Sequence, residues 1–210
     1  MDQTVIQRTV ENLKRNGMDA VVVPTCDMVR KQVQTYLSEG DTAAFGGSVS
    51  LEESGILSLL RSLSAEGKLS LLDRGKEGLS AEDIARIMRD AFSADVYFTS
   101  SNAITAEGRL YNVDGNGNRT AAMIFGPKTV IVVAGINKIV ENDERAIARV
   151  REIAAPKNGV RLGLDTPCAK VGHCVDCMHD QRMCASYVFL GKQRTPGRIK
   201  VVLVEETLGY

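Results

Sequence analysis

The stretch that decides the fold runs from residue 42 to residue 60 and reads TAAFGGSVSLEESGILSLL. Its beginning is a short apolar run that predicts a strand, and its end predicts the start of a helix. Gly46 and Gly47 stand between the two and let the backbone turn sharply and approach a ligand closely. Ser48 or Ser50 can cap the helix, and free amides together with the helix dipole favour an anion there. The stretch therefore predicts a strand–loop–helix unit that is either a phosphate or carboxylate site or an ordinary turn.

The alternation of strand and helix extends from the N-terminus to about residue 155. Short β-branched runs predict buried strands, and segments with helical periodicity or capping sequences separate them. The predicted strands are residues 19–23, 42–45, 69–73, 95–101, 128–135 and 198–204, and the predicted helices are residues 3–16, 27–37, 52–62, 80–92, 119–125 and 142–153. This order is typical of a mostly parallel sheet with helices on both faces. We therefore expect one α/β domain over residues 1–210, with a cysteine-rich insertion at about 166–186.

The overall charge excludes some classes of partner. Lys plus Arg equals Asp plus Glu at 26 each, whereas general nucleic-acid binding needs a basic surface. No apolar run approaches the roughly 20 residues of a transmembrane helix. The N-terminal residues lack the basic and apolar regions of a signal peptide. We therefore expect a cytoplasmic protein with neither nucleic acid nor membrane as a partner.

Four of the five cysteines fall within seventeen residues, at Cys168, Cys174, Cys177 and Cys184. Thiolates bind zinc and iron–sulfur clusters, and a C-x-x-C pair lets two sulfurs reach one metal. The spacing matches neither the bacterial ferredoxin run nor the usual two-pair zinc ribbon, so it does not separate zinc from an iron–sulfur cluster. The alternatives are redox-active thiols centred on Cys174 and Cys177, structural disulfides, and thiols without a ligand. Cys26, between a strand and a helix, is expected to be a half-buried thiol.

A second group of polar residues follows the strand predicted at 95–101. Ser100, Ser101 and Asn102 should lie at the same sheet edge as the loop at 46–48, because parallel strands bring their carboxyl ends together. This placement predicts that the two loops bind one ligand between them.

Further polar residues follow in the same part of the chain. Glu107 is the candidate for acid–base or nucleophilic chemistry, and the alternative is a solvated turn residue. Arg119 is the candidate for bidentate hydrogen bonding to a carboxylate or phosphate, and Asn116 is a further candidate for binding the same ligand. Lys128 and Lys138 flank the strongest predicted strand, and we expect both to be solvated.

Several stretches taken together resemble the LUD domain family, of the lactate utilization protein C type. They are Gly46-Gly47-Ser48 with Glu52, the run from Thr99 to Thr105, Gly108 with Leu110 and Asn112, Gly115-Asn116 with Arg119, and the strand from Val130 to Gly135 with Asn137-Lys138. The cysteine-rich tail, Gly197-Arg198-Ile199 and the closing residues 205–210 resemble a stand-alone subgroup of that family. The order and spacing of these motifs carry the resemblance, which covers nearly the whole chain.

The resemblance implies a three-layer α/β fold similar to the sugar-phosphate isomerase and coenzyme A transferase superfamily. It also implies that the loop at 46–48 holds a substrate anion, and that the protein acts in lactate or related hydroxy-acid utilization beside iron–sulfur oxidoreductase subunits. The nucleophilic glutamate of the coenzyme A transferases has no secure match to Glu107. Two alternatives remain, an isomerase or transferase acting on a phosphorylated or coenzyme A substrate, and a non-catalytic assembly or regulatory subunit.

Overall fold

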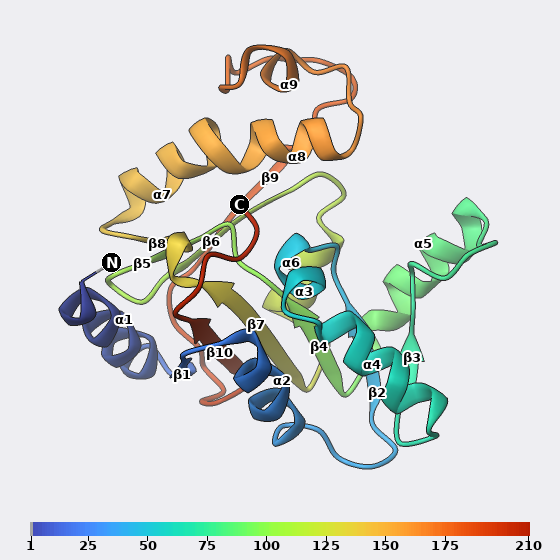
Figure 1. Ribbon diagram of the computed structural model, residues 1–210. Coiled ribbons are helices and arrows are strands. Elements are labelled where there is room, and N and C mark those ends of the chain that lie inside the picture. Colours follow the sequence, from blue (N-terminus) through green and yellow to red (C-terminus); the bar gives the residue numbers. More distant parts are fainter. Residues whose placement is uncertain (1) are drawn as a thin grey trace.

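Six parallel strands form the central sheet, in the order β1-β10-β7-β4-β2-β3 (Figure 1). The computed structural model describes residues 2–210. The strands of this sheet are β1 (Asp19–Val23), β2 (Thr42–Phe45), β3 (Ser70–Leu72), β4 (Val96–Thr99), β7 (Thr129–Gly135) and β10 (Ile199–Val204). Helices flank the sheet, and the predicted α/β fold is confirmed.

A second, smaller sheet lies beside the first, in the order β8-β5-β6-β9. Its strands are β8 (Ile139–Val140), β5 (Ala103–Thr105), β6 (Leu110–Asp114) and β9 (Ser186–Leu190). This sheet was not predicted, since its strands have only two to five residues and β6 pairs with β9, which lies 72 to 80 positions further along the chain. The rings of Tyr111 on β6 and Phe189 on β9 stack with their centroids 4.3 Å apart.

The helices follow the predicted order, but two of the predicted helices are altered and the short helices η2 (Ile136–Lys138) and α9 (Pro167–Val171) were not predicted. They are α1 (Gln3–Arg15), α2 (Cys26–Gln34), α3 (Val49–Glu53), α4 (Ile56–Ala65), α5 (Ala81–Asp90), η1 (Ala91–Ser93), α6 (Asn118–Ile124), η2 (Ile136–Lys138), α7 (Asp143–Arg149), η3 (Val150–Ala154), α8 (Ala155–Arg161) and α9 (Pro167–Val171). Within residues 2–210, every helix is too short or too polar to cross a membrane.

The single helix predicted at 52–62 is wrong, because the segment forms α3 and α4 with a break between them. Gly55 has a φ of 73°, a left-handed conformation that is open to glycine and ends the first helix. The helix predicted at 142–153 is longer than expected and continues through α8. The intervening η3 is a π-helical turn, and it precedes Pro156, which has no N–H to donate to the preceding turn.

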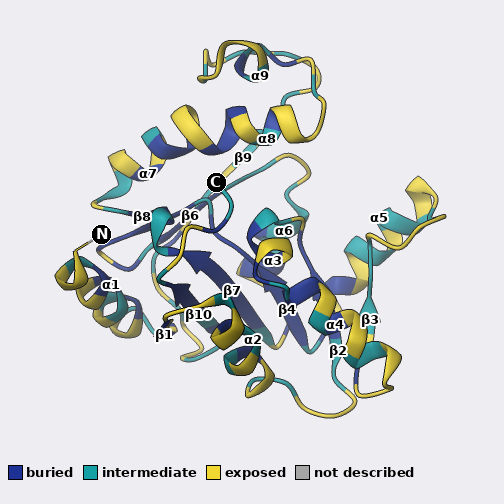
Figure 2. Cartoon of the chain, in the orientation of Figure 1, coloured by how far each residue is buried: buried dark blue, intermediate teal, exposed yellow. Residues whose placement is uncertain are grey.

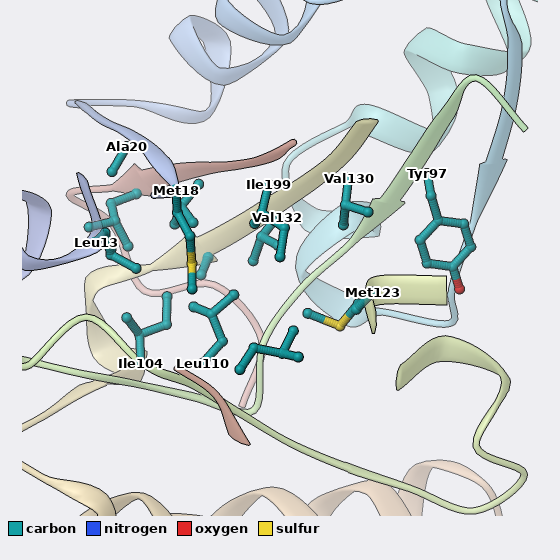
Figure 3. Packing of buried hydrophobic residues seen from close by; sticks show 14 of the residues in the cluster. Leu13, Met18, Ala20, Tyr97, Ile104, Leu110, Met123, Val130, Val132 and Ile199 are labelled. Atoms are coloured by element: carbon teal, nitrogen blue, oxygen red, sulfur yellow. The ribbon is translucent and has the colours of Figure 1, made fainter. Parts of the chain in front are cut away.

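Three apolar clusters join these layers. One face of the central sheet packs on α1, α6 and the small sheet, through the buried residues shown in Figure 3. The other face packs on α2, α3 and α4. A third cluster joins the small sheet to α7, η3 and α8. Figure 2 shows the consequence, with buried strands at the centre and exposed helix surfaces outside.

Candidate functional site

Three neighbouring strands, β2, β4 and β7, end at the same edge of the central sheet. The register pairs Phe45 with Phe98 and Thr99 with Val132, so β2 and β4 end within one residue of each other and β7 continues three residues further in the same direction. The backbone N–H of Gly46 donates to the carbonyl of Phe98 at 2.9 Å and ties the first two ends together. Parallel strands therefore bring together three loops that are distant in sequence.

A cavity of about 440 Å³ opens over these loops. It is lined by residues 47–50 after β2, residues 100–102 after β4, residues 113–116, 118 and 119 between β6 and α6, Lys138 after β7, residues of η3 and α8, residues 180–184 and Tyr210. Gly47, Ser48, Ser100, Ser101, Asn102, Asn116 and Arg119 are thus candidate residues that line one cavity. What they bind stays a prediction.

The loop at Gly46–Ser48 packs closely against Tyr97 and Arg119 at Gly46 and caps α3 through Ser48. A Cβ atom at Gly46 would lie 2.8 Å from Tyr97 Oη and 3.0 Å from Arg119 Cγ, so only glycine fits without displacing them. Gly47 is exposed and has open space around it. Ser48 is the N-cap of α3, because its hydroxyl accepts from the N–H of Leu51 at 3.3 Å. The expected serine cap is therefore present.

Arg119 joins the loops of the site to one another. Its Nη1 donates to Asn112 Oδ1 at 2.6 Å and to the Ser100 carbonyl at 3.2 Å. Its Nη2 donates to Asn102 Oδ1 at 3.0 Å and to the Val113 carbonyl at 2.9 Å. The side chain is only 11% exposed. Four protein oxygens thus occupy both terminal nitrogens, so in this arrangement Arg119 positions the walls of the cavity.

Ser101 and Asn102 also fix the loop that follows β4. Ser101 Oγ donates to the carbonyls of Ala103 and Tyr111 at 2.8 and 3.2 Å. Asn102 Oδ1 accepts from the N–H of Val113 at 2.9 Å, and Arg149 Nη1 donates to the Asn102 carbonyl at 2.6 Å. The Ser100 hydroxyl instead accepts a hydrogen bond from Lys138 Nζ at 3.0 Å.

Lys138 is a residue of this site that was not among the candidates predicted from the sequence. The expectation of a solvated side chain is wrong for Lys138, which is only 4% exposed, although it holds for Lys128, whose side chain is 80% exposed. The Lys138 Nζ donates to Ser50 Oγ at 2.7 Å and to Ser100 Oγ at 3.0 Å. The available signal was its position just beyond the carboxyl end of the strongest strand.

Burial and nearby positive charge act together on this amine. Desolvation lowers the pKa of Lys138 from its ordinary 10.5 to about 7, and repulsion from Arg149 and Arg119 adds to the effect. Glu53 opposes the change, but its carboxylate accepts from the backbone N–H of Gly209. The site therefore holds a lysine that is poised between its charged and neutral forms at neutral pH.

The charged residues around the cavity are mostly basic. Five basic side chains line it, Arg74, Arg119, Lys138, Arg161 and Arg182, against the two acidic side chains Asp114 and Asp180. The whole chain, by contrast, has no net charge. Positive charge is therefore concentrated around this cavity, which favours an anionic ligand.

Glu107 lies outside this cavity, in the turn between β5 and β6. It is exposed and pairs with the side chain of Arg109, which also contacts Asp143 at 2.9 Å. The backbone carbonyl of Glu107 accepts from the Asn16 side chain of the α1 C-cap. Its surroundings in this structure match those of a solvated turn residue, and its catalytic role stays a prediction.

The cysteine-rich segment forms α9 and an adjoining loop above α8 (Figure 1). Cys168 is buried, with its sulfur 3.4 Å from the Thr166 hydroxyl, while Cys174, Cys177 and Cys184 are half-buried and all are free thiols. Among residues 2–210, no three Cys, His, Asp or Glu side chains gather closely enough to hold a metal ion. The four sulfurs thus do not fit a metal or cluster in this arrangement.

Arg182 organises the loop that carries three of these cysteines. Its Nη1 donates to the Cys177 carbonyl at 2.6 Å, and its Nη2 donates to the Cys184 carbonyl at 3.0 Å. These hydrogen bonds from Arg182 tie together the two ends of the segment from Cys177 to Cys184. Zinc or an iron–sulfur cluster stays a prediction, and iron, zinc and sulfide analysis of anaerobically prepared protein tests it.

Comparison with known proteins agrees with this architecture. The sequence profile of the LUD domain matches residues 6–204. No curated protein matches the chain significantly. Among solved structures, the chain is similar to a DUF162 family protein from Deinococcus radiodurans, with a TM-score of 0.55, 14% identity and 96% of each chain covered. At that identity the likeness shows a common fold.

Proposed function

The chain belongs to the LUD domain family, and on this premise we propose that it acts in hydroxy-acid utilization by binding a small anionic metabolite in the cavity. The family membership supports the metabolic role. The choice of an anionic ligand rests on one observation, the placement of Lys138 at the cavity beside two serine hydroxyls. A small carboxylate of the lactate and pyruvate type is the ligand that we propose first.

The positive charge of a buried lysine favours an anionic ligand. An ammonium group taken out of water is unfavourable unless an opposite charge compensates for it. Among the described residues, the Lys138 amine contacts hydroxyls and forms no ion pair. A carboxylate or phosphate in the cavity supplies the missing negative charge, and the arginines at the rim add to the attraction.

Calorimetry tests this proposal with compounds of known charge and shape. Lactate, glycolate, pyruvate, a sugar phosphate and an acyl-coenzyme A are titrated into wild-type protein and into Lys138→Met. We expect at least one carboxylate to bind and its dissociation constant to rise about tenfold or more in the variant, which corresponds to about 1.4 kcal/mol.

Lys128→Met is the matched control, since Lys128 is exposed at the opposite end of the same strand. It should bind as the wild type does. Unchanged affinity in Lys138→Met, or no binding of any compound, would contradict the proposal. Preference for the sugar phosphate or the acyl-coenzyme A would favour an isomerase or transferase instead.

Docking to an iron–sulfur oxidoreductase subunit is a separate proposal, supported by the family association alone. Co-purification of such a subunit with the wild type, and its loss in a Cys174→Ser and Cys177→Ser double variant, is the expected result. Co-purification that does not depend on these cysteines would place the contact elsewhere.

A further inference from the structure

The Lys138 amine and the two serine hydroxyls that hold it form a compact polar group at the cavity. Ser50 and Ser100 come from the ends of different strand–loop units, and both are buried. Ser50 Oγ donates to the carbonyl of Leu208 at 3.3 Å, which leaves its oxygen lone pairs to accept from Lys138. The amine is thus held at a fixed position while it still lines an open cavity.

The number of partners suits a neutral amine. A neutral amine has two N–H donors, and two hydroxyl oxygens lie within hydrogen-bond distance. An ammonium group has three donors, and among residues 2–210 no carboxylate pairs with this one. A neutral amine also keeps a lone pair, which makes it a nucleophile toward carbonyl carbon.

We propose that Lys138 forms an imine with a small anion that carries an aldehyde or ketone group. The inference rests on the proposed function, because the anionic group of the ligand brings the carbonyl to the cavity. It goes further by assigning covalent chemistry to one side chain and by restricting the ligand to carbonyl compounds. A 2-oxo acid and an open-chain sugar phosphate both have this chemistry.

The reaction is balanced without an oxidant or reductant. The lone pair of Nζ attacks the carbonyl carbon, a C–N bond forms, and the π electrons move to the carbonyl oxygen. That oxygen takes up a proton as Nζ loses one, and the product is a carbinolamine. The hydroxyl of the carbinolamine then takes up a proton from solvent, the nitrogen lone pair forms the C=N bond as the C–O bond breaks, water leaves, and a protonated imine remains.

The surroundings of Lys138 suit both steps. Ser50 and Ser100 touch the amine and are close enough to transfer protons to and from the oxygen that becomes the leaving water. Lowering of the pKa of Lys138 to about 7 keeps a large fraction of the amine neutral at neutral pH. Arg161 and Arg182 line the cavity and attract a carboxylate or phosphate through their charge, while Nη1 and Nη2 of Arg182 donate to the carbonyls of Cys177 and Cys184.

Reductive trapping tests the inference. Wild-type protein is incubated with pyruvate, glyoxylate or glyceraldehyde 3-phosphate in the presence of cyanoborohydride, which reduces an imine to a stable secondary amine. Intact mass and peptide mapping then locate the adduct. We expect one adduct per chain on Lys138 for at least one compound, and loss of that adduct in Lys138→Arg and Lys138→Met.

Lactate serves as the control ligand, since it has a carboxylate but no aldehyde or ketone group. Lactate should bind without giving an adduct and should slow trapping of the oxo acid. If the anions bind in calorimetry and no adduct forms at Lys138, this inference is overturned while the proposed function stands. If no anion binds, both fail. Equal labelling of Lys138 and the exposed Lys128 and Lys170 would also overturn it, since it would indicate unselective reaction.

Discussion

Lys138 Nζ donates a hydrogen bond to Ser50 Oγ at 2.7 Å, across 88 positions of sequence. This contact joins the segment after β7 to the helix that follows β2, and the bond from the same nitrogen to Ser100 adds the segment after β4. One amine therefore connects three neighbouring ends of the parallel sheet. The arrangement has consequences for stability as well as for ligand binding.

The stability of the folded chain should depend on pH through Lys138. The pKa of this amine is about 7 in the folded protein and near its ordinary 10.5 in the unfolded chain. Between these values the unfolded chain binds more protons, so the free energy of unfolding rises with pH. This contribution is complete above about pH 10 and is lost as the pH falls to about 7, with a slope of at most about 1.4 kcal/mol per pH unit.

Urea unfolding of wild type and Lys138→Met at pH 6, 7.5 and 9 measures this contribution. We expect the free energy of unfolding of the wild type to rise between pH 6 and pH 9 through Lys138, and that of Lys138→Met to lack this rise. The value for the variant minus the value for the wild type should therefore fall as the pH rises. Lys128→Met should run parallel to the wild type. Parallel curves for Lys138→Met would show that the buried amine does not change its charge in this range.

The two glycines of the loop after β2 should differ in their tolerance of a side chain. An alanine Cβ at Gly46 meets Tyr97 Oη at 2.8 Å and Arg119 Cγ at 3.0 Å, and both of these side chains are held by packing or hydrogen bonds. We expect Gly46→Ala to lower the free energy of unfolding by about 1–3 kcal/mol. Gly47→Ala has nothing within 4 Å and should change it by less than about 0.5 kcal/mol. Equal effects of the two substitutions in denaturant unfolding would contradict the packing described here.

Arg119→Lys should destabilise the protein even though it keeps the charge. A lysine cannot reproduce the planar fork that donates to Asn112, Asn102 and two backbone carbonyls, and it leaves buried acceptors without partners. At about 1–3 kcal/mol for each unsatisfied group, we expect a loss of at least about 3 kcal/mol in the free energy of unfolding.

Arg86→Lys is a suitable control for that substitution. Arg86 pairs with Asp83 on the exposed face of α5, and its own side chain is 67% exposed. The control should change the free energy of unfolding by less than about 0.5 kcal/mol. An equally small effect of Arg119→Lys would mean that water replaces the lost donors.

The parallel sheet could be predicted from the sequence because its inner strands β10, β7, β4 and β2 are buried almost throughout and their apolar runs are continuous. Membership of the LUD family followed from the order of the motifs and is confirmed. The small sheet could not be predicted in the same way, since its strands have only two to five residues and β9 pairs with β6 from 72 to 80 positions away. Local periodicity carries no information about such pairing.

The loops of the cavity could be placed together because parallel strands fix where their carboxyl ends lie. The state of individual side chains within them could not. Whether Lys138 points to water or to Ser50 depends on the packing of η2 against α3, and whether Arg119 meets a ligand or Asn112 depends on the path of β6. Residue type and spacing leave both outcomes open, and tertiary contacts decide between them.

Cys26 should be the least reactive of the partly exposed thiols, despite its position at the start of α2. Burial raises the pKa of this thiol to about 11, and the hydrogen bond to Glu206 and the charge of that carboxylate add to the effect. The thiol donates to Glu206 Oε2 at 2.9 Å. Since alkylation requires the thiolate, Cys26 should react slowly at pH 8 and faster as the pH rises toward 11.

Glu206→Gln removes the negative charge while keeping an acceptor near the sulfur. We expect the rate of Cys26 alkylation by iodoacetamide at pH 8 to rise several-fold in this variant, as measured by peptide mass spectrometry with Cys177 as the internal reference. Glu205→Gln is the matched control, because Glu205 accepts from Gln3 instead and should leave the Cys26 rate unchanged. If Glu206→Gln has no effect on the rate, burial alone holds the Cys26 thiol in its protonated form, and the carboxylate has no part in its low reactivity.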